Sequence, residues 1–181
     1  ANASQAFRPM TFSELIPSAT TDVIDPNLKD SEALNIDLGV RGSWKNYIHY
    51  DVSVYQMNIQ DRIGTYTQSS VRYVTNIGAS LSKGIELYVE GNVPSKFKQG
   101  KCGSLHPFVS IAYNEATYTS WNDPTVLAGS SSDRTNKAVE NAPRRIQRYG
   151  LTYKLKGFCA TYQLNKVSEA FADALNTVAP N

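Results

Sequence analysis

Short runs in which apolar and polar residues alternate recur along the chain, and this period of two constrains its fold most strongly. Successive side chains of a β-strand point to opposite faces, so each run predicts a strand with one apolar and one polar face. Residues 34–41 alternate without an exception. The other runs are residues 48–54, 85–89, 105–113, 149–155 and 158–164, with 71–77 as a weaker candidate. The sequence therefore predicts an all-β fold of about seven antiparallel strands with little helix.

The connections between these runs differ in length. Residues 42–46 and 156–157 have the length of hairpin turns, and the join at 92–104 is intermediate. The long polar stretches are residues 60–72, residues 119–142 and everything after residue 168. Such a pattern places the long loops at one end of the sheet. Outer-membrane β-barrels have this asymmetry, with short periplasmic turns and long extracellular loops.

Alternation alone does not separate a barrel from a soluble β-sandwich, because both have one apolar and one wet face. Charged residues in the middle of the polar faces favour a water-filled lumen. They are Asp37, Arg41, Asp51, Glu86, Glu90, Arg148 and Lys154. Many of the eleven tyrosines fall in or beside the runs, as in the aromatic girdles of barrels, namely Tyr47, Tyr50, Tyr55, Tyr88, Tyr113, Tyr149 and Tyr153. Strands favour tyrosine in any protein, so both architectures stay open at this point.

Composition excludes two classes of protein. The formal net charge is +2 and only 19% of residues are charged, so the concentrated basic footprint of a nucleic-acid-binding protein is missing. No apolar run approaches the roughly 20 residues that a membrane-spanning helix requires. We expect no nucleic-acid partner and no helical membrane span.

The polar residues give little support to enzymatic chemistry. His49 and Asp51 lie two apart and share a strand face, but no motif supplies the nucleophile or third ligand that catalysis or metal binding needs. We expect no enzymatic activity, no metal site and no cofactor. Cys102 and Cys159 lie near the same end of the predicted sheet, where a disulfide or two separate thiols are both open.

Six short segments follow one another along the chain in a recognisable order. The most specific is NIG at 76–78 followed by SKGIE at 82–86. The others are AFRP with FSEL at 6–9 and 12–15, DPNLK with IDLGVRG at 25–29 and 36–42, DVSVY with DRI at 51–55 and 61–63, NAPRR at 141–145, and FADALNT at 171–177, which reads as a strand end. Together they resemble the β-barrel of TonB-dependent outer-membrane receptors, most closely the ferric-citrate and siderophore receptors of the Bacteroidetes type. Asp30 and Ser31 depart from the Pro-Glu that usually stands there.

The resemblance implies a 22-stranded transmembrane barrel, filled by a separate plug domain, in the cell outer membrane. Such a receptor imports an iron chelate, ferric citrate or a siderophore complex, with energy supplied through TonB. Residues 1–181 would then form part of the barrel wall, truncated at both ends, with the plug domain and the final strands absent. The implied partners are the iron chelate, outer-membrane lipid, the receptor's own plug domain and TonB.

Candidate ligand contacts follow from the same resemblance. Ferric chelates are commonly anionic or rich in oxygen donors, so arginine and tyrosine on the extracellular side offer suitable charge-assisted hydrogen bonds. The candidates are Arg8, Arg62, Tyr66, Arg72 and Arg134. An ordinary solvated loop residue is the alternative for each, and Arg8 has a second alternative, a structural role beside Pro9. The competing functions are a soluble β-sandwich module that binds a ligand or glycan, and a passive barrel without a plug.

Overall fold

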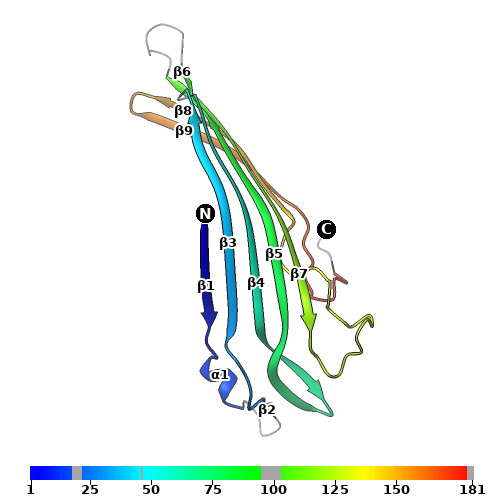
Figure 1. Ribbon diagram of the computed structural model, residues 1–181. Helices are drawn as coiled ribbons and strands as arrows, with labels where there is room; N and C mark the ends of the chain where they lie inside the picture. The colour runs from blue at the N-terminus through cyan, green and yellow to red at the C-terminus, as the bar shows by residue number, and fades with distance from the viewer. Residues whose placement is uncertain (18–21, 46, 95–102, 179–181) are drawn as a thin grey trace.

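The computed structural model describes residues 1–17, 22–45, 47–94 and 103–178, and their strands form one long, twisted sheet (Figure 1). Along the sheet the order is β1-β3-β4-β5-β7-β8-β9, with neighbours antiparallel. The all-β antiparallel prediction is confirmed. The strands are β1 (Asn2–Arg8), β3 (Ser31–Trp44), β4 (Ile48–Gln68), β5 (Val71–Gly91), β7 (Ser104–Trp121), β8 (Arg145–Leu155) and β9 (Phe158–Val167), and the short β6 (Val93–Pro94) adds to β7.

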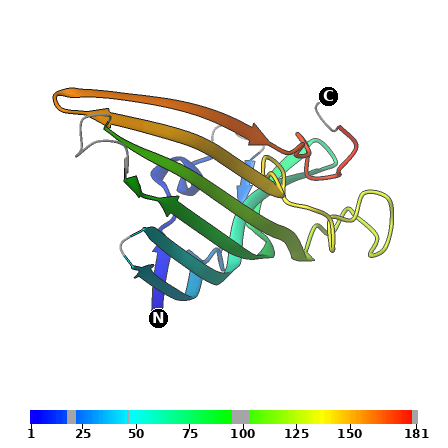
Figure 2. The same ribbon diagram turned by 90° about the horizontal axis from the view of Figure 1, so that it is seen from above.

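One face of this sheet is apolar and open. The described strands form a single layer, and the view from above shows them side by side in one open sheet (Figure 2). Leu38 and Val40 of β3 remain 61% and 62% exposed, although they lie in the middle of a regular strand. A β-sandwich would bury this face against a second sheet. The sandwich that alternation left open is therefore not the fold of these residues.

The apolar face has the dimensions of a membrane crossing. On β7 its side chains run from Leu105 to Tyr113, nine residues, against the roughly 9–11 of a transmembrane β-strand. The register aligns them with neighbouring strands, for example Leu38 with Val54, and Val54 with Ile85. We call this surface the apolar band. It comprises Leu34, Ile36, Leu38, Val40, Ile48, Tyr50, Val52, Val54, Ile85, Leu87, Val89, Leu105, Pro107, Val109, Ile111, Tyr113, Tyr149, Leu151, Tyr153, Phe158, Ala160, Tyr162 and Leu164.

The opposite face is polar, as the alternation predicts. Arg41 pairs with Asp51 across β3 and β4, and Ser53 pairs with Glu86 across β4 and β5. Asp51, Glu86 and Arg148 line an open groove of 510 Å³ on this polar face. Within the apolar band, the two faces thus separate lipid-compatible from water-compatible side chains.

The β4–β5 hairpin is longer than the sequence predicts, and the prediction of a loop at residues 60–72 is wrong. β4 continues to Gln68, and Ser69 and Ser70 form a two-residue turn with φ values of 50° and 64°. Two positive φ angles are typical of a type I′ hairpin turn. Alternation lapses here because both faces are polar beyond the apolar band and because the register shifts between Ile59 and Ile63. The separate runs at 71–77 and 85–89 are parts of one strand, β5.

The amino-terminal segment contains elements that the sequence did not predict. Besides β1, it forms a one-turn helix α1 (Phe12–Leu15) and the short strand β2 (Asp22–Ile24). β2 pairs in parallel with β5, so the connection between neighbours β1 and β3 reaches two strands beyond β3. No helix in the described part of the chain is long and apolar enough to cross a membrane.

Three further expectations concern the remaining connections. The stretch expected as loop from residue 119 begins later, because β7 extends to Trp121. The segment at 171–177 is not a strand end: β9 stops at Val167, and Asp173 organises a turn by accepting backbone N–H groups from Leu175, Thr177 and Val178. The question of a Cys102–Cys159 disulfide falls outside the described residues, since Cys102 is not among them.

Candidate ligand-binding site

The five candidate residues all lie at the long-loop end of the sheet, drawn at the bottom of Figure 1. They fall into three places there. Arg62 of β4 and Arg134 of the segment at 122–144 approach the same pair of aromatic rings. Tyr66 and Arg72 sit beside the β4–β5 turn, and Arg8 lies at the end of β1 next to α1.

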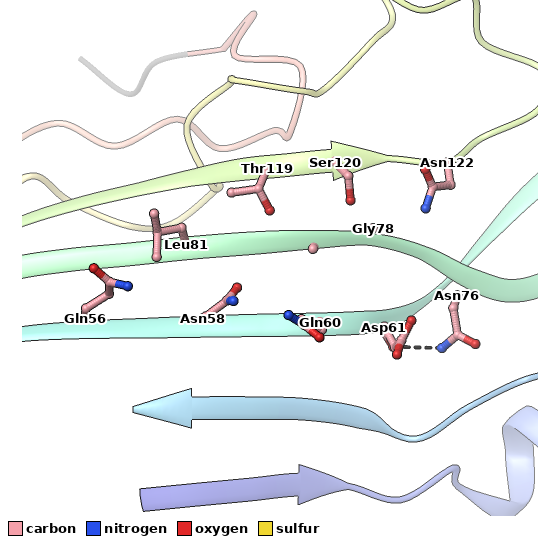
Figure 3. A pocket seen from close by; sticks show the side chains of 11 residues that line it. Gln56, Asn58, Gln60, Asp61, Asn76, Gly78, Leu81, Thr119, Ser120 and Asn122 are labelled. Carbon is pink, nitrogen blue, oxygen red and sulfur yellow. Dashed lines mark hydrogen bonds between the residues drawn. The ribbon is translucent and has the colours of Figure 1, made fainter. Parts of the chain in front are cut away.

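A bulge in β4 sets the direction of Arg62. Asp61 adopts a φ of 50°, and its carbonyl oxygen accepts hydrogen bonds from Ser31 Oγ and Asn76 Nδ2, each at 2.8 Å. Figure 3 shows the bond from Asn76. Asn76 also exchanges hydrogen bonds with the backbone of Lys29, so β5 holds the bulge and the chain before β3 together. A bulge changes the direction of the side chains beside it, and the side chain redirected here is that of Arg62.

Arg62 lies against buried groups of the next two strands. Its Nη1 donates to Ser80 Oγ of β5 at 3.0 Å, and its guanidinium carbon is 5.4 Å from the centre of the Tyr118 ring of β7. Ser80 and Tyr118 are each only 2% exposed. The pairing of Ser80 with Tyr118 continues the rows of the polar face, so Arg62 belongs to that face.

Tyr118 links the strand to the segment that follows it. Its hydroxyl donates to a carboxylate oxygen of Glu140. Burial, followed by this bond and the charge of Glu140, raises the pKa of Tyr118 to about 12, so the phenol is neutral at any physiological pH. The backbone of Lys137 and Asn136 also bonds to Tyr118, which keeps the segment beside β7.

Arg134 completes the group from the other side. Its guanidinium lies 4.0 Å from the centre of the Trp121 ring, and Trp121 meets Tyr118 edge-to-face with ring centres 5.4 Å apart. Cations over tryptophan are the strongest class of cation–π contact. The Nε of Arg134 is buried and has no hydrogen-bond partner among the described residues. We call Arg62, Tyr118, Trp121, Arg134 and Glu140 the arginine–aromatic cluster.

The sequence predicted the two arginines of this cluster but missed its other members. Tyr118 and Trp121 continue the β7 run past its last apolar alternation, and Glu140 is one acidic residue in a long polar stretch. The signal that could have identified Tyr118 and Trp121 is their position at the end of a strand, directly before a long loop.

The hairpin turn carries the second pair of candidates. Tyr66 stacks on its cross-strand partner Tyr73 with ring centres 4.9 Å apart and planes 8° from parallel. Arg72 forms an ion pair with Asp22 of β2 at 3.2 Å. The turn therefore presents a flat aromatic surface beside a guanidinium.

Arg8 is engaged in a local contact. Its Nη2 lies 2.7 Å from Glu14 Oε1, and the other oxygen of Glu14 accepts the backbone N–H of Thr11 at 2.7 Å. This ion pair joins the end of β1 to α1. It matches the structural alternative that the sequence left open for this residue.

A polar groove of 440 Å³ lies on the same face of the sheet as the apolar band, beyond the end of the band (Figure 3). Gln56, Asn58 and Gln60 line it from β4, and Thr119 and Asn122 line it from the β7 side. Across the described parts of the chain, no three His, Cys, Asp or Glu side chains are grouped so as to hold a metal ion. His49 and Asp51 lie on the polar face, as predicted.

An open-faced sheet with a lipid-compatible band and a polar opposite side is the wall of an outer-membrane β-barrel. The TonB dependent receptor-like β-barrel family matches residues 1–179. The chain belongs to this family, and its place is the outer membrane. The family match does not single out the ferric-citrate and siderophore subgroup.

Two solved structures share the fold. The chain is similar to the copper transporter OprC, with a TM-score of 0.57 and 22% identity over 93% of this chain and 23% of that one. It is also similar to the FrpB iron transporter from Neisseria meningitidis (F3-3 variant), with a TM-score of 0.58 and 17% identity over 82% of this chain and 21% of that one. The chain spans less than a quarter of either protein. Comparison with curated protein sequences gave no significant match.

Proposed function

We propose that this chain is a wall segment of a TonB-dependent transporter that imports an iron chelate, either ferric citrate or a siderophore complex. Family membership and the iron transporter among the structural neighbours support this function. The observation that carries it is the arginine–aromatic cluster, which gathers two guanidinium groups on the polar face at the long-loop end. The whole receptor would supply the plug domain and would engage TonB as a separate partner, and the chain itself would need no cofactor and perform no enzymatic step.

The chemistry of the cluster suits an anionic chelate. Guanidinium groups bind carboxylate and other oxygen donors through charge-assisted hydrogen bonds, which are stronger than neutral ones. The buried Nε of Arg134 has no hydrogen-bond partner within the described parts of the chain, and the Trp121 ring lies against its guanidinium. The Tyr66–Tyr73 stack and Arg72 stand at the same end and would make the first contacts of an arriving ligand. For Arg8 the proposal takes the structural alternative, which its ion pair with Glu14 supports.

The test uses the full-length receptor with Arg62→Gln or Arg134→Gln. Each change removes a charge but keeps a hydrogen-bonding side chain, and each is expected to weaken chelate binding about tenfold or more. Calorimetric titration with ferric citrate and with a ferric siderophore measures the effect. Arg8→Gln is the matched control, because it removes an arginine at the same end without touching the cluster.

The outcomes separate the alternatives. Unchanged affinity in both cluster variants, or an equal loss in Arg8→Gln, would show that the cluster is not the binding site. A receptor that binds copper ions or an oligosaccharide but neither ferric chelate would refute the iron-chelate assignment. Heat-dependent gel mobility of each variant checks that the barrel has assembled.

A further inference from the structure

A second groove collects positive charge outside the arginine–aromatic cluster. It has a volume of 580 Å³ and lies between the start of β8 and the end of β9. Arg144, Arg145 and Lys166 line it together with Tyr113 and Gln147. All three basic residues are exposed, and none of them forms an ion pair with another described residue. We call this the basic groove.

The register places the basic groove on the lipid side of the sheet. Arg145 pairs with Tyr113, Gln147 pairs with Ile111, and Lys166 pairs with Gln147. Paired residues of antiparallel strands share a face, so Arg145 and Lys166 stand on the same face as the apolar band. Two residues further along the strands, this face is apolar, with Tyr149 on β8 and Leu164 on β9.

The basic groove therefore lies at the edge of the apolar band, on the long-loop side. Long loops mark the extracellular end of such barrels, so this edge meets the headgroups of the outer leaflet. Tyr113 at its margin is 42% exposed and is placed as a girdle residue would be. A strand added beyond β9 would pair in the plane of the sheet and would leave this face open.

The acidic groups around the basic groove do not cancel its charge. Glu169 lines it, which leaves three cations against one carboxylate. Glu115, the next residue outward on this face of β7, is paired with Lys83 of β5 at 3.2 Å. The basic groove therefore keeps a net positive charge at the level of the membrane surface.

We propose that the basic groove binds a phosphate group of an outer-leaflet glycolipid, whose acyl chains lie along the apolar band. Arg145 and Lys166 contact the phosphate oxygens, and Arg144 adds a third charge. Arginine and lysine at a membrane surface attract anionic headgroups, and pockets of basic residues hold them in place. Charge complementarity and continuity with the apolar band identify this occupant. The proposal is independent of which chelate the receptor transports.

The experiment uses the full-length receptor in an uncharged detergent and a bisphosphorylated lipid A as the probe. Native mass spectrometry measures how much lipid stays bound during titration. The double variant Arg145→Gln/Lys166→Gln is expected to bind it about 30-fold more weakly, because two surface charges are lost. Arg148→Gln is the matched control, since Arg148 lies on the same strand but on the opposite face.

Two further probes identify what is recognised. Dephosphorylated lipid A is expected to bind weakly to both the wild type and the double variant, and inorganic phosphate is expected to compete poorly. Equal lipid retention in wild type and double variant, or an equal loss in Arg148→Gln, would overturn the proposal. Efficient competition by inorganic phosphate would assign the basic groove to a free anion instead of a lipid. Retained chelate binding by the double variant shows that the receptor is folded.

Discussion

Replacing Leu38 with arginine in the full-length receptor is expected to lower the free energy of unfolding by about 2–4 kcal/mol. Leu38 is 61% exposed in the apolar band and stands opposite Val54, so the new charge would face hydrocarbon near the middle of the crossing. Val52→Arg should behave in the same way, because Val52 pairs with Val40 on the same face. Denaturant unfolding of the receptor in phospholipid vesicles measures the change.

The matched control is Asn35→Arg on the same strand. Asn35 belongs to the polar face, and its side chain donates to Asp37 at 3.3 Å. An arginine there would meet water and a carboxylate, so we expect little change in stability. If Leu38→Arg cost no more than Asn35→Arg, the assignment of the two faces to lipid and lumen would be wrong.

This contrast between faces is the part of the fold that the sequence predicts well. Alternation records a difference between two environments, and it persists only where one face meets lipid and the other water. Residues 34–41 and 105–113 lie within that zone and were identified as strands. Residues 60–68 continue β4 beyond it, where both faces are polar, and the pattern that would reveal a strand is lost.

The candidate site was predictable only by residue type. Arginines that suit an anionic ligand can be picked from the polar stretches, but their neighbours depend on the register. Arg62 reaches Tyr118 because β4 is bulged at Asp61, and Arg134 reaches Trp121 because the segment after β7 folds back along it. The isolated bridge between Thr117 and Ala138 records that return. Contacts of this kind leave no periodic signal in the sequence.

A second substitution with a large expected effect on stability is Gly84→Ala. Gly84 belongs to the signature at residues 76–86. A Cβ at this position would collide with the backbone oxygen of Tyr113 and would lie 2.6 Å from the hydroxyl of Tyr55. Tyr55 lies across β5 at this glycine and donates to Asn114 Oδ1 of β7 at 3.0 Å. Gly84→Ala is expected to cost about 1–3 kcal/mol for overpacking and about 1 kcal/mol more for the displaced hydrogen bond.

Two variants divide this cost between its causes. Tyr55→Phe removes only the hydrogen bond and should cost about 1 kcal/mol in the same unfolding measurement. Adding Tyr55→Ala to Gly84→Ala frees the space taken by the ring but leaves the collision with the Tyr113 backbone, so it should restore stability only in part. A Gly84→Ala receptor as stable as the wild type would contradict this account. The glycine of the family signature then has a structural explanation, because it lets a tyrosine cross one strand to bind the next.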